Sequence, residues 1–348
     1  MGTPQETAYP LIGLIASKNP VSALELTVQS LFRGGCSRVV VVNDGSDDPQ
    51  SLLIFDRVAS AGAEIIHLEK NVGKCAALKV GFKTIPRQSL IVQTDDDTLA
   101  GDLAGPARML REHKADIVDI RVETARTHSL LGFVQELDYW LINAVTKRVQ
   151  DFLKARLWMS GASVMYNYKA GVELLTRKTY TITEDTEGMF RARTKGCTIK
   201  FYSKRDAQFI TMVPEDFHGL HKQWKRWTTG NGQVIGRYGF GGGSTWIATI
   251  NIFTWLQIFV PIVVAVRFGI VSTSLWAFGW GFLAGVVGAI QLKRPRVALV
   301  GIFMPFFTLA WNLYAIVGLY LAYRYSRSGK EVVLTWISPK RTTIEALP

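Results

Sequence analysis

Acidic residues gather at one point of this sequence. Three consecutive aspartates, Asp95 to Asp97, follow an apolar-rich run in "SLIVQTDDD" (89–97). Adjacent carboxylates repel one another unless a cation or a positively charged ligand group lies close. Asp95 and Asp97, spaced as D-x-D, could hold Mg²⁺ or Mn²⁺ while a diphosphate fills the remaining coordination positions. The plainer interpretation is a capping cluster for the helix that follows.

Two further carboxylates and a lysine stand at predicted turns. Asp44 in "VVVVNDGSDD" follows an apolar run, where it could bind a nucleotide base or ribose, or form an ordinary turn. Asp185 in "TITEDTEGMF" begins an apparent helix, either as a general base or as an acidic residue that the helix dipole favours. Lys74 follows Gly73 before another helix and is either a phosphate or base contact or a surface lysine.

The segment "HKQWKRWTTGNG" (221–232) places a lysine and an arginine between two tryptophans. This composition is typical of a basic amphipathic helix at a membrane surface. The same side chains could equally line an active site. The local sequence leaves both interpretations open.

The elements that would position these residues alternate between strand and helix. Short β-rich runs occur at 11–17, 38–44, 63–69 and 89–95, a fifth is expected at 115–123, and helical patterns lie between the first four. This alternation predicts an α/β fold with a mostly parallel sheet covered by helices. Such sheets bind ligands beyond the carboxyl ends of their strands, which is where Asp44 and Asp95 fall.

The chain divides by charge near residue 240. Residues 1–240 form the expected cytoplasmic domain, with amphipathic interface helices near 129–157 and 217–232. Within 129–157 one apolar face is expected, and it could equally pack within the domain or lie at the membrane interface. The face is made of Leu130, Phe133, Leu137, Trp140, Leu141, Ala144 and Val145.

A predicted transmembrane region follows at 241–323, and a basic tail occupies 324–348. The region contains about three apolar spans, each long enough to cross a hydrocarbon core for which ~20 residues suffice; they cover about 246–266, 270–292 and 297–323. The positive loop "LKRPR" (292–296) is expected in the cytoplasm. Because the basic tail also favours the cytoplasm, one span should be interfacial, re-entrant or broken. We expect a multi-pass protein of the plasma (cytoplasmic) membrane.

The composition excludes several function classes. We attribute the net charge of +12 to Lys and Arg near the membrane and in sites for phosphate-bearing ligands, and not to a nucleic-acid-binding surface. Three scattered cysteines provide neither a disulfide framework nor a zinc site. Neither a Walker loop nor a G-x-G-x-x-G after a strand occurs, which argues against a P-loop enzyme and a dinucleotide oxidoreductase.

The ordered set of motifs resembles the processive inverting family-2 glycosyltransferases, which include hyaluronan, chitin and cellulose synthases. The resemblance covers roughly residues 10–340. Its motifs are, in order, "NDGSDD", "NVGKCAAL", "DDD", "SGA" (160–162), "TED" (183–185) and Q-x-x-R-W as Gln223, Arg226 and Trp227.

That resemblance implies a GT-A-like nucleotide-sugar-binding domain and a role for each matching residue. Asp44, Lys74 and Asp95 would contact the nucleotide of a UDP-sugar, and Asp97 with Asp95 would hold Mg²⁺ or Mn²⁺. Asp185 would take the proton from the acceptor hydroxyl. Gln223 and Arg226 would bind the diphosphate, Trp227 would stack on the acceptor sugar, and Ser160 and Gly161 would lie near the sugars.

The expected function is therefore transfer of a sugar from a UDP-sugar to the growing end of a β-linked polysaccharide at a lipid bilayer. These synthases usually begin with transmembrane helices, which this sequence lacks, so a second copy or a partner protein would complete a channel. The Trp-Gly-Thr motif of hyaluronan synthases is matched only at Trp336.

Two alternatives remain open at this stage. One keeps the enzyme class but transfers a single sugar to a polyprenyl phosphate or another lipid. The other is a nucleotide-sensing membrane protein without catalysis, in which Asp185 would need no role as a base.

Overall fold

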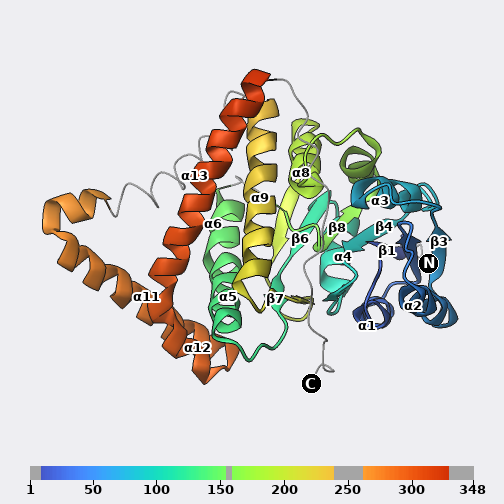
Figure 1. Ribbon diagram of the computed structural model, residues 1–348. Coiled ribbons are helices and arrows are strands. Elements are labelled where there is room, and N and C mark those ends of the chain that lie inside the picture. The colour runs from blue at the N-terminus through green and yellow to red at the C-terminus, as the bar shows by residue number, and fades with distance from the viewer. Residues whose placement is uncertain (1–8, 154–158, 239–261, 329–348) are drawn as a thin grey trace, which may run out of the picture.

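Strands and helices alternate along the first hundred residues of the computed structural model, which describes residues 9–153, 159–238 and 262–328 (Figure 1). The four β-rich runs are confirmed as β1 (Leu11–Ser17), β2 (Arg38–Asn43), β3 (Glu64–His67) and β4 (Leu90–Thr94). The helices between them are α1 (Ala23–Arg33), α2 (Pro49–Ser60) and α3 (Lys74–Phe82).

One strand of the main sheet runs against all the others. The sheet has the order β3-β2-β1-β4-β8-β6-β9, where β8 spans Ser163–Asn167, β6 spans Ile117–Ile120 and β9 spans Ile199–Tyr202. Only β8 pairs antiparallel, with β4 and with β6. The predicted, mostly parallel sheet is therefore confirmed. Because β8 is reversed, the loop before it lies at the edge where β4 ends.

The single strand expected at 115–123 is wrong in extent, because the chain forms two strands there. After β6, the strand β7 (Val122–Thr124) leaves for a second sheet of order β5-β10-β7, with β5 at Thr98–Leu99 and β10 at Phe209–Thr211. The change occurs at Arg121, whose backbone N–H still bonds Tyr202 O at 3.0 Å while its side chain pairs with Glu123.

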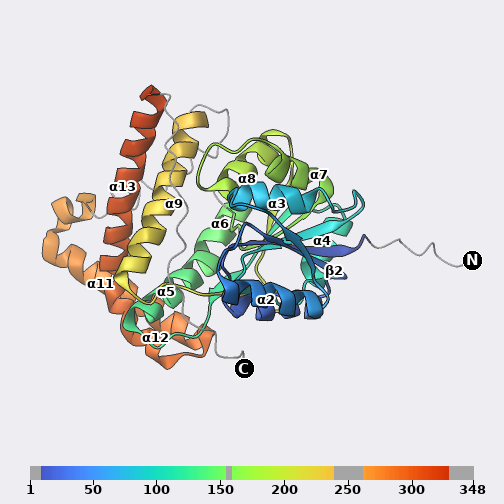
Figure 2. The same ribbon diagram turned by 45° about the vertical axis from the view of Figure 1, so that its right-hand side comes forward.

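Helices cover both faces of the main sheet (Figure 2). One apolar core lies between the sheet and α1, α2 and α4 (Ala104–Arg111). The other joins the opposite face to α3, α7 (Tyr168–Gly171), the π-helical turn η2 (Val172–Thr176) and α8 (Glu184–Thr194).

The long helix expected at 129–157 is interrupted. It consists of α5 (Leu130–Leu141), a π-helical turn η1 (Ile142–Thr146) and α6 (Lys147–Phe152), and residues 154–158 lie outside the described residues. The expected apolar face holds at Leu137 and Trp140, which are buried, but fails at Leu130 and Val145, which are 56% and 50% exposed. The π turn explains Val145, because one extra residue rotates the helix face.

The C-terminal part begins with α9 (Phe217–Tyr238) and continues, after the undescribed residues, through α11 (Ile270–Leu292), α12 (Pro295–Val300), the 3₁₀ turn η3 (Gly301–Phe303) and α13 (Met304–Ser328). In both views α13 lies alongside α9 (Figures 1 and 2). Two helical stretches, Ile270–Leu292 and Pro295–Gly318, are long and apolar enough to cross a membrane. Most of the first expected span, 246–266, lies outside the described residues.

The end of α11 and the turn that follows it contact helix α5. Arg294 lies 3.5 Å from the Glu136 carboxylate, and the Trp140 indole N–H donates to Gln291 at 3.0 Å. The basic loop 292–296 therefore lies against the α/β domain.

Candidate functional site

The site is assembled where β4 ends and β8 begins. Thr94 pairs in register with Ser163, so the aspartates after β4 stand beside the Ser160–Ala162 loop before β8. The Thr94 hydroxyl donates to Ala162 O at 2.8 Å, and the Gln93 amide donates to Gly161 O at 3.3 Å. The end of β4 and the Ser160–Ala162 loop are thus joined by hydrogen bonds between residues 68 positions apart in the sequence.

Lys74 connects two of the predicted acidic segments. Its ammonium forms a close ion pair with Asp95 and lies 3.7 Å from Glu184, the neighbour of Asp185. Burial acts to lower the pKa of Lys74, but Asp95 and Glu184 outweigh it and raise that pKa above the ordinary value. Lys74 is therefore a firmly charged lysine inside the site and not a surface residue.

Asp44 holds the turn that presents Lys74. Its carboxylate, 4% exposed, accepts hydrogen bonds from the backbone N–H groups of Val72 at 2.7 Å and Gly73 at 3.0 Å. Gly73 has φ +88°, a conformation that favours glycine, immediately before α3. Asp44 thus lies at the predicted edge and fixes the start of α3.

The three aspartates point in different directions. Asp96 accepts a hydrogen bond of 2.6 Å from the Ser17 hydroxyl and is held against β1. Asp97 is 3% exposed, with the Thr98 hydroxyl 3.3 Å from Oδ1. Asp95 faces Lys74. The middle residue is therefore fixed against β1, whereas Asp95 and Asp97, the two residues of the D-x-D pattern, contact Lys74 and Thr98.

Asp185 lies against the Ser160–Ala162 loop. Its Oδ2 accepts the Gly161 N–H at 3.0 Å, and its Oδ1 accepts the Thr186 N–H at 2.7 Å. A Cβ at position 161 would sit 3.0 Å from the same carboxylate oxygen. A side chain at position 161 would therefore press on the Asp185 carboxylate.

A buried ion pair supports this loop from behind. Lys147 of α6 lies 3.1 Å from Asp119 of β6, and both side chains are inaccessible or nearly so. Asp119 also accepts a long hydrogen bond of 3.4 Å from the Ser160 N–H. Sequence reasoning missed this pair, because Lys147 lies in a segment whose charges were expected to face outward.

Helix α9 brings the Q-x-x-R-W residues to the site. It packs on the segment before Asp185, where the Ile182 N–H donates to Gln233 at 2.9 Å and Gly230 lies directly against Thr183. Gln223 and Arg226 are half-buried on this helix. Their spacing of three residues places them on neighbouring positions of one face.

Tyr139 of α5 lies within electrostatic range of the site, and Asp138 precedes it in the sequence. Burial raises the pKa of Asp138 to about 7. Burial, Asp138 and Asp97 raise the pKa of Tyr139, while Arg226 opposes them. The effects of Asp97 and Arg226 on the Tyr139 pKa show that the aspartate turn and α9 both lie close to α5. An aspartate inside the apolar run "LDYWL" was the sequence signal for this group.

The two tryptophans of the opening segment have different surroundings. Trp224 is 6% exposed, and its ring meets those of Phe307, Trp311 and Tyr314 on α13 edge-on. Trp227 is half-buried, and its ring centre lies 6.3 Å from that of Trp311. Trp224 is therefore a packing residue, while Trp227 keeps an accessible surface.

The residues at the aspartate turn fit a magnesium or manganese ion that is bound together with a substrate diphosphate. No group of three or more His, Cys, Asp and Glu side chains suited to a metal occurs in the described ranges. Mg²⁺ is commonly held by one or two carboxylates together with substrate phosphates. Asp97 and Asp95 supply two carboxylates, so the donor set fits an ion bound together with a diphosphate and not a preformed protein cage.

Comparison with known proteins gives matches of sequence and fold. Residues 90–324 match the family described as "Glycosyl transferase family group 2". A poly-β-1,6-N-acetyl-D-glucosamine synthase of Staphylococcus aureus (strain COL) is 27% identical over 228 residues, which are 64% of this chain and 54% of the synthase. Its Staphylococcus epidermidis counterpart is 28% identical over 201 residues, 57% of this chain and 48% of the synthase. The chain spans about half the length of these curated relatives.

The fold is shared with a solved structure of low sequence identity. A mannosyltransferase from Pyrobaculum calidifontis, solved in complex with GDP-mannose and Mn²⁺, superposes with a TM-score of 0.58 at 15% identity. The match covers 94% of this chain and 90% of that one. The expected GT-A-like α/β domain is thereby confirmed.

Proposed function

Because this chain belongs to glycosyl transferase family group 2, we propose that it is a membrane-bound, inverting glycosyltransferase that moves a sugar from a UDP-sugar to the growing end of a β-linked polysaccharide. The observation that carries the proposal is the Lys74 bridge between Asp95 and Glu184. This bridge joins the segment suited to a nucleotide diphosphate to the segment that bears Asp185.

The chemistry follows from the positions of these groups. Asp185 takes the proton of the acceptor hydroxyl, whose oxygen forms a bond to the anomeric carbon of the donor sugar. The bond from that carbon to the diphosphate breaks, and its electron pair leaves with UDP. Attack opposite the leaving group inverts the anomeric centre, so an α-linked donor gives a β-linked product.

The charge of the departing diphosphate needs compensation. A Mg²⁺ or Mn²⁺ ion bound by Asp97 and Asp95 would neutralise part of this charge. Arg226 and Lys74 supply protein cations at the same edge, with Gln223 as a hydrogen-bond donor beside Arg226. Asp44 acts by fixing the turn before Lys74 and lies where a base or ribose can reach it. Trp227 offers an aromatic surface for the acceptor sugar, near Ser160 and Gly161.

The proposed organisation keeps the expected boundaries. Residues 1–240 form the cytoplasmic catalytic domain with its interface helices, 241–323 form the multi-pass membrane region, and 324–348 form the basic tail. The apolar helices α11 and α13 support attachment to a bilayer. The matched polysaccharide synthases make N-acetylglucosamine the first sugar to test.

The testing experiment uses the purified full chain in detergent with Mg²⁺ or Mn²⁺. UDP-N-acetylglucosamine, UDP-glucose, UDP-glucuronic acid and GDP-mannose are offered in turn, and nucleotide release and product length are measured. We expect release from one UDP-sugar, an extended product, and loss of transfer when EDTA removes the metal. A product one sugar longer than a lipid acceptor would favour the lipid alternative. Undiminished activity in EDTA would refute the metal assignment.

A further inference from the structure

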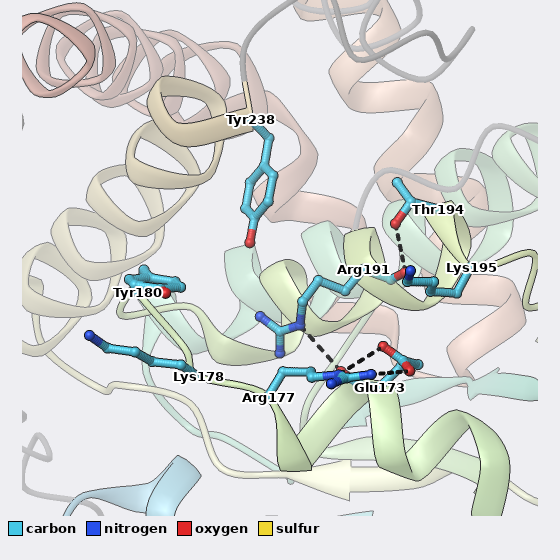
Figure 3. Close-up of a pocket in the computed structure, with 8 residues that line it drawn as sticks. All are labelled: Glu173, Arg177, Lys178, Tyr180, Arg191, Thr194, Lys195 and Tyr238. Atoms are coloured by element: carbon cyan, nitrogen blue, oxygen red, sulfur yellow. Dashed lines mark hydrogen bonds and ion pairs between the residues drawn. The ribbon is translucent and has the colours of Figure 1, made fainter.

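A hollow lies at the C-terminal end of α8, and none of the residues that line it belongs to the proposed active site. It has a volume of about 300 Å³, at the lower end of the range of small-molecule pockets (~300–1,000 Å³). Four cations and a single carboxylate contribute to its lining: Arg177, Lys178, Arg191, Lys195 and Glu173. Figure 3 shows Arg177 and Arg191 converging on Glu173 while the Tyr238 hydroxyl points toward the same space.

The cations that line this hollow outnumber the carboxylates that pair with them. Arg177 pairs with Glu173 at 3.3 Å. Lys195, exposed at the opposite wall, has no carboxylate partner among the residues that the structure describes. A concave surface whose lining carries an excess of positive charge concentrates its field and attracts negative charge. The ligand that this lining favours is therefore a compact anion.

The wall of the hollow is tied to the segment that precedes Asp185. Glu187 is fully buried and lies on α8 between the two. Its Oε1 accepts the Tyr238 hydroxyl at 2.7 Å and lies 2.9 Å from Arg191. Its Oε2 accepts the backbone N–H groups of Tyr180 at 2.8 Å and Thr181 at 3.0 Å. One carboxylate thus serves both the hollow and the chain that leads to Asp185.

We propose that this hollow binds a phosphate-bearing ligand and that its occupancy slows the transfer reaction. A bound phosphate competes with Glu187 for Arg191, and the buried carboxylate then holds Tyr180 and Thr181 less firmly. The shift reaches Asp185 four residues later. Because the effector and the donor occupy different sites, the effect is a coupling between them. The binding step goes beyond the proposed function and does not depend on it.

The binding test uses inorganic phosphate and the UDP-saturated full chain in detergent, so that the donor site is occupied. Calorimetry should detect phosphate binding that Lys195→Ala weakens about tenfold, the loss of one charge-assisted contact. Lys204→Ala is the matched control, an exposed lysine outside the hollow. Equal affinity in both variants, or no binding by the wild type, would overturn the proposal. The cations would then only offset the dipole at the end of α8.

The rate test follows kcat for the sugar transfer as phosphate is added. We expect kcat to fall in the wild type and in Lys204→Ala, and to change little in Lys195→Ala. Vesicles with and without an anionic phospholipid distinguish a lipid headgroup from free phosphate as the source of the ligand. Binding without any change in kcat would refute the coupling, whereas an inactive chain that still binds phosphate would refute only the proposed function.

Discussion

At the residue scale, the position of Asp185 separates two roles that a carboxylate can have in this site. Its two oxygens accept backbone N–H groups of Gly161 and Thr186, and Lys74 reaches Asp95 and Glu184 instead. The carboxylate is thus oriented by the Ser160–Ala162 loop, which we propose lies near the acceptor, while the lysine lies on the proposed donor side. Substitution of a carboxylate that acts as a base should affect the transfer rate, whereas substitution of one that binds the donor should affect UDP affinity.

Asp185→Asn should abolish transfer and leave UDP affinity within a few-fold of the wild type. The amide keeps the size of the side chain but cannot take a proton, and general bases contribute ~10²–10⁴ in rate. Single-turnover transfer and UDP calorimetry on the same preparation measure the two effects. A variant that loses UDP binding while its remaining turnover is near normal would assign Asp185 to the donor.

Trp227→Ala and Trp224→Ala should fail in different ways. Trp227 is half-buried and available to a sugar, so its loss should remove most transfer to sugar acceptors and spare the fold, since stacking is worth on the order of 1 kcal/mol or more. Trp224 packs against three aromatic rings, and truncation in such a core costs about 3–5 kcal/mol. Thermal unfolding in detergent should show a lower Tm for Trp224→Ala alone. Equal, mild defects would contradict both assignments.

The raised pKa of Asp138 predicts a pH-dependent stability. Burial raises this pKa to about 7, whereas the unfolded carboxyl ionises near ~4, so folding takes up a proton between these values. The free energy of unfolding therefore falls as the pH rises from about 4 to 7. Asp138→Asn should flatten this part of the Tm profile and raise Tm at pH 7.5. Asp56→Asn, exposed on α2, is the control, and parallel profiles for the two variants would refute the prediction.

At the element scale, the site depends on the close packing of α9 against the loop that precedes α8. Gly230 allows this approach, because a Cβ there would overlap the Thr183 side chain. On the other side of α9, a Cβ at Gly318 of α13 would lie only 2.6 Å from the backbone oxygen of Thr228. The helix that carries Arg226 is therefore held between the α/β domain and an apolar helix.

Gly230→Ala should lower kcat strongly while the chain stays folded. The new methyl group pushes α9 away from Thr183, two residues before Asp185, although alanine in a helix is otherwise favoured by about 1 kcal/mol over glycine. The control is Gly279→Ala on α11, where nothing lies within 4 Å of an added Cβ. Tm and kcat are measured for both, and equal activities would show that the contact does not position the base.

Local sequence patterns predict where strands and helices lie better than which distant segments they contact. The runs at β1 to β4 and the aspartates after β4 were identified because apolar strands and turn residues are local signals. The reversal of β8, the division at Arg121 and the π turn after Leu141 depend on contacts between distant segments, such as Asn143 with Val122 O at 2.6 Å. For the same reason Lys147 and Asp138 could be placed only by the fold.

At the scale of the whole molecule, the apolar surface lies on the C-terminal helices. Large exposed apolar side chains are concentrated there, among them Phe268, Ile270, Leu275, Leu309 and Leu313, each more than half exposed. Contiguous surface of this kind indicates a membrane or protein partner. The same helices are the two stretches long enough to cross a bilayer.

The full chain should therefore stay in the membrane fraction after washing with high salt and alkaline carbonate. These washes release proteins held by charge, whereas helices that cross the bilayer are retained by burial of ~20 apolar residues. Immunoblots of pellet and supernatant measure the distribution, with a peripheral protein of the same host as the control. Release by carbonate would show that α11 and α13 pack against protein and do not span the bilayer.

The buried pair of Lys147 and Asp119 has a consequence for how this sequence can diverge. Loss of either partner alone leaves an uncompensated charge in the interior, which is strongly destabilising at about 3–5 kcal/mol. A lineage that changes one position must therefore pass through a poorly folded intermediate unless the other changes with it. Among descendants of a common ancestor, the two positions should be inherited as a unit, either both charged or both replaced by apolar residues of similar volume.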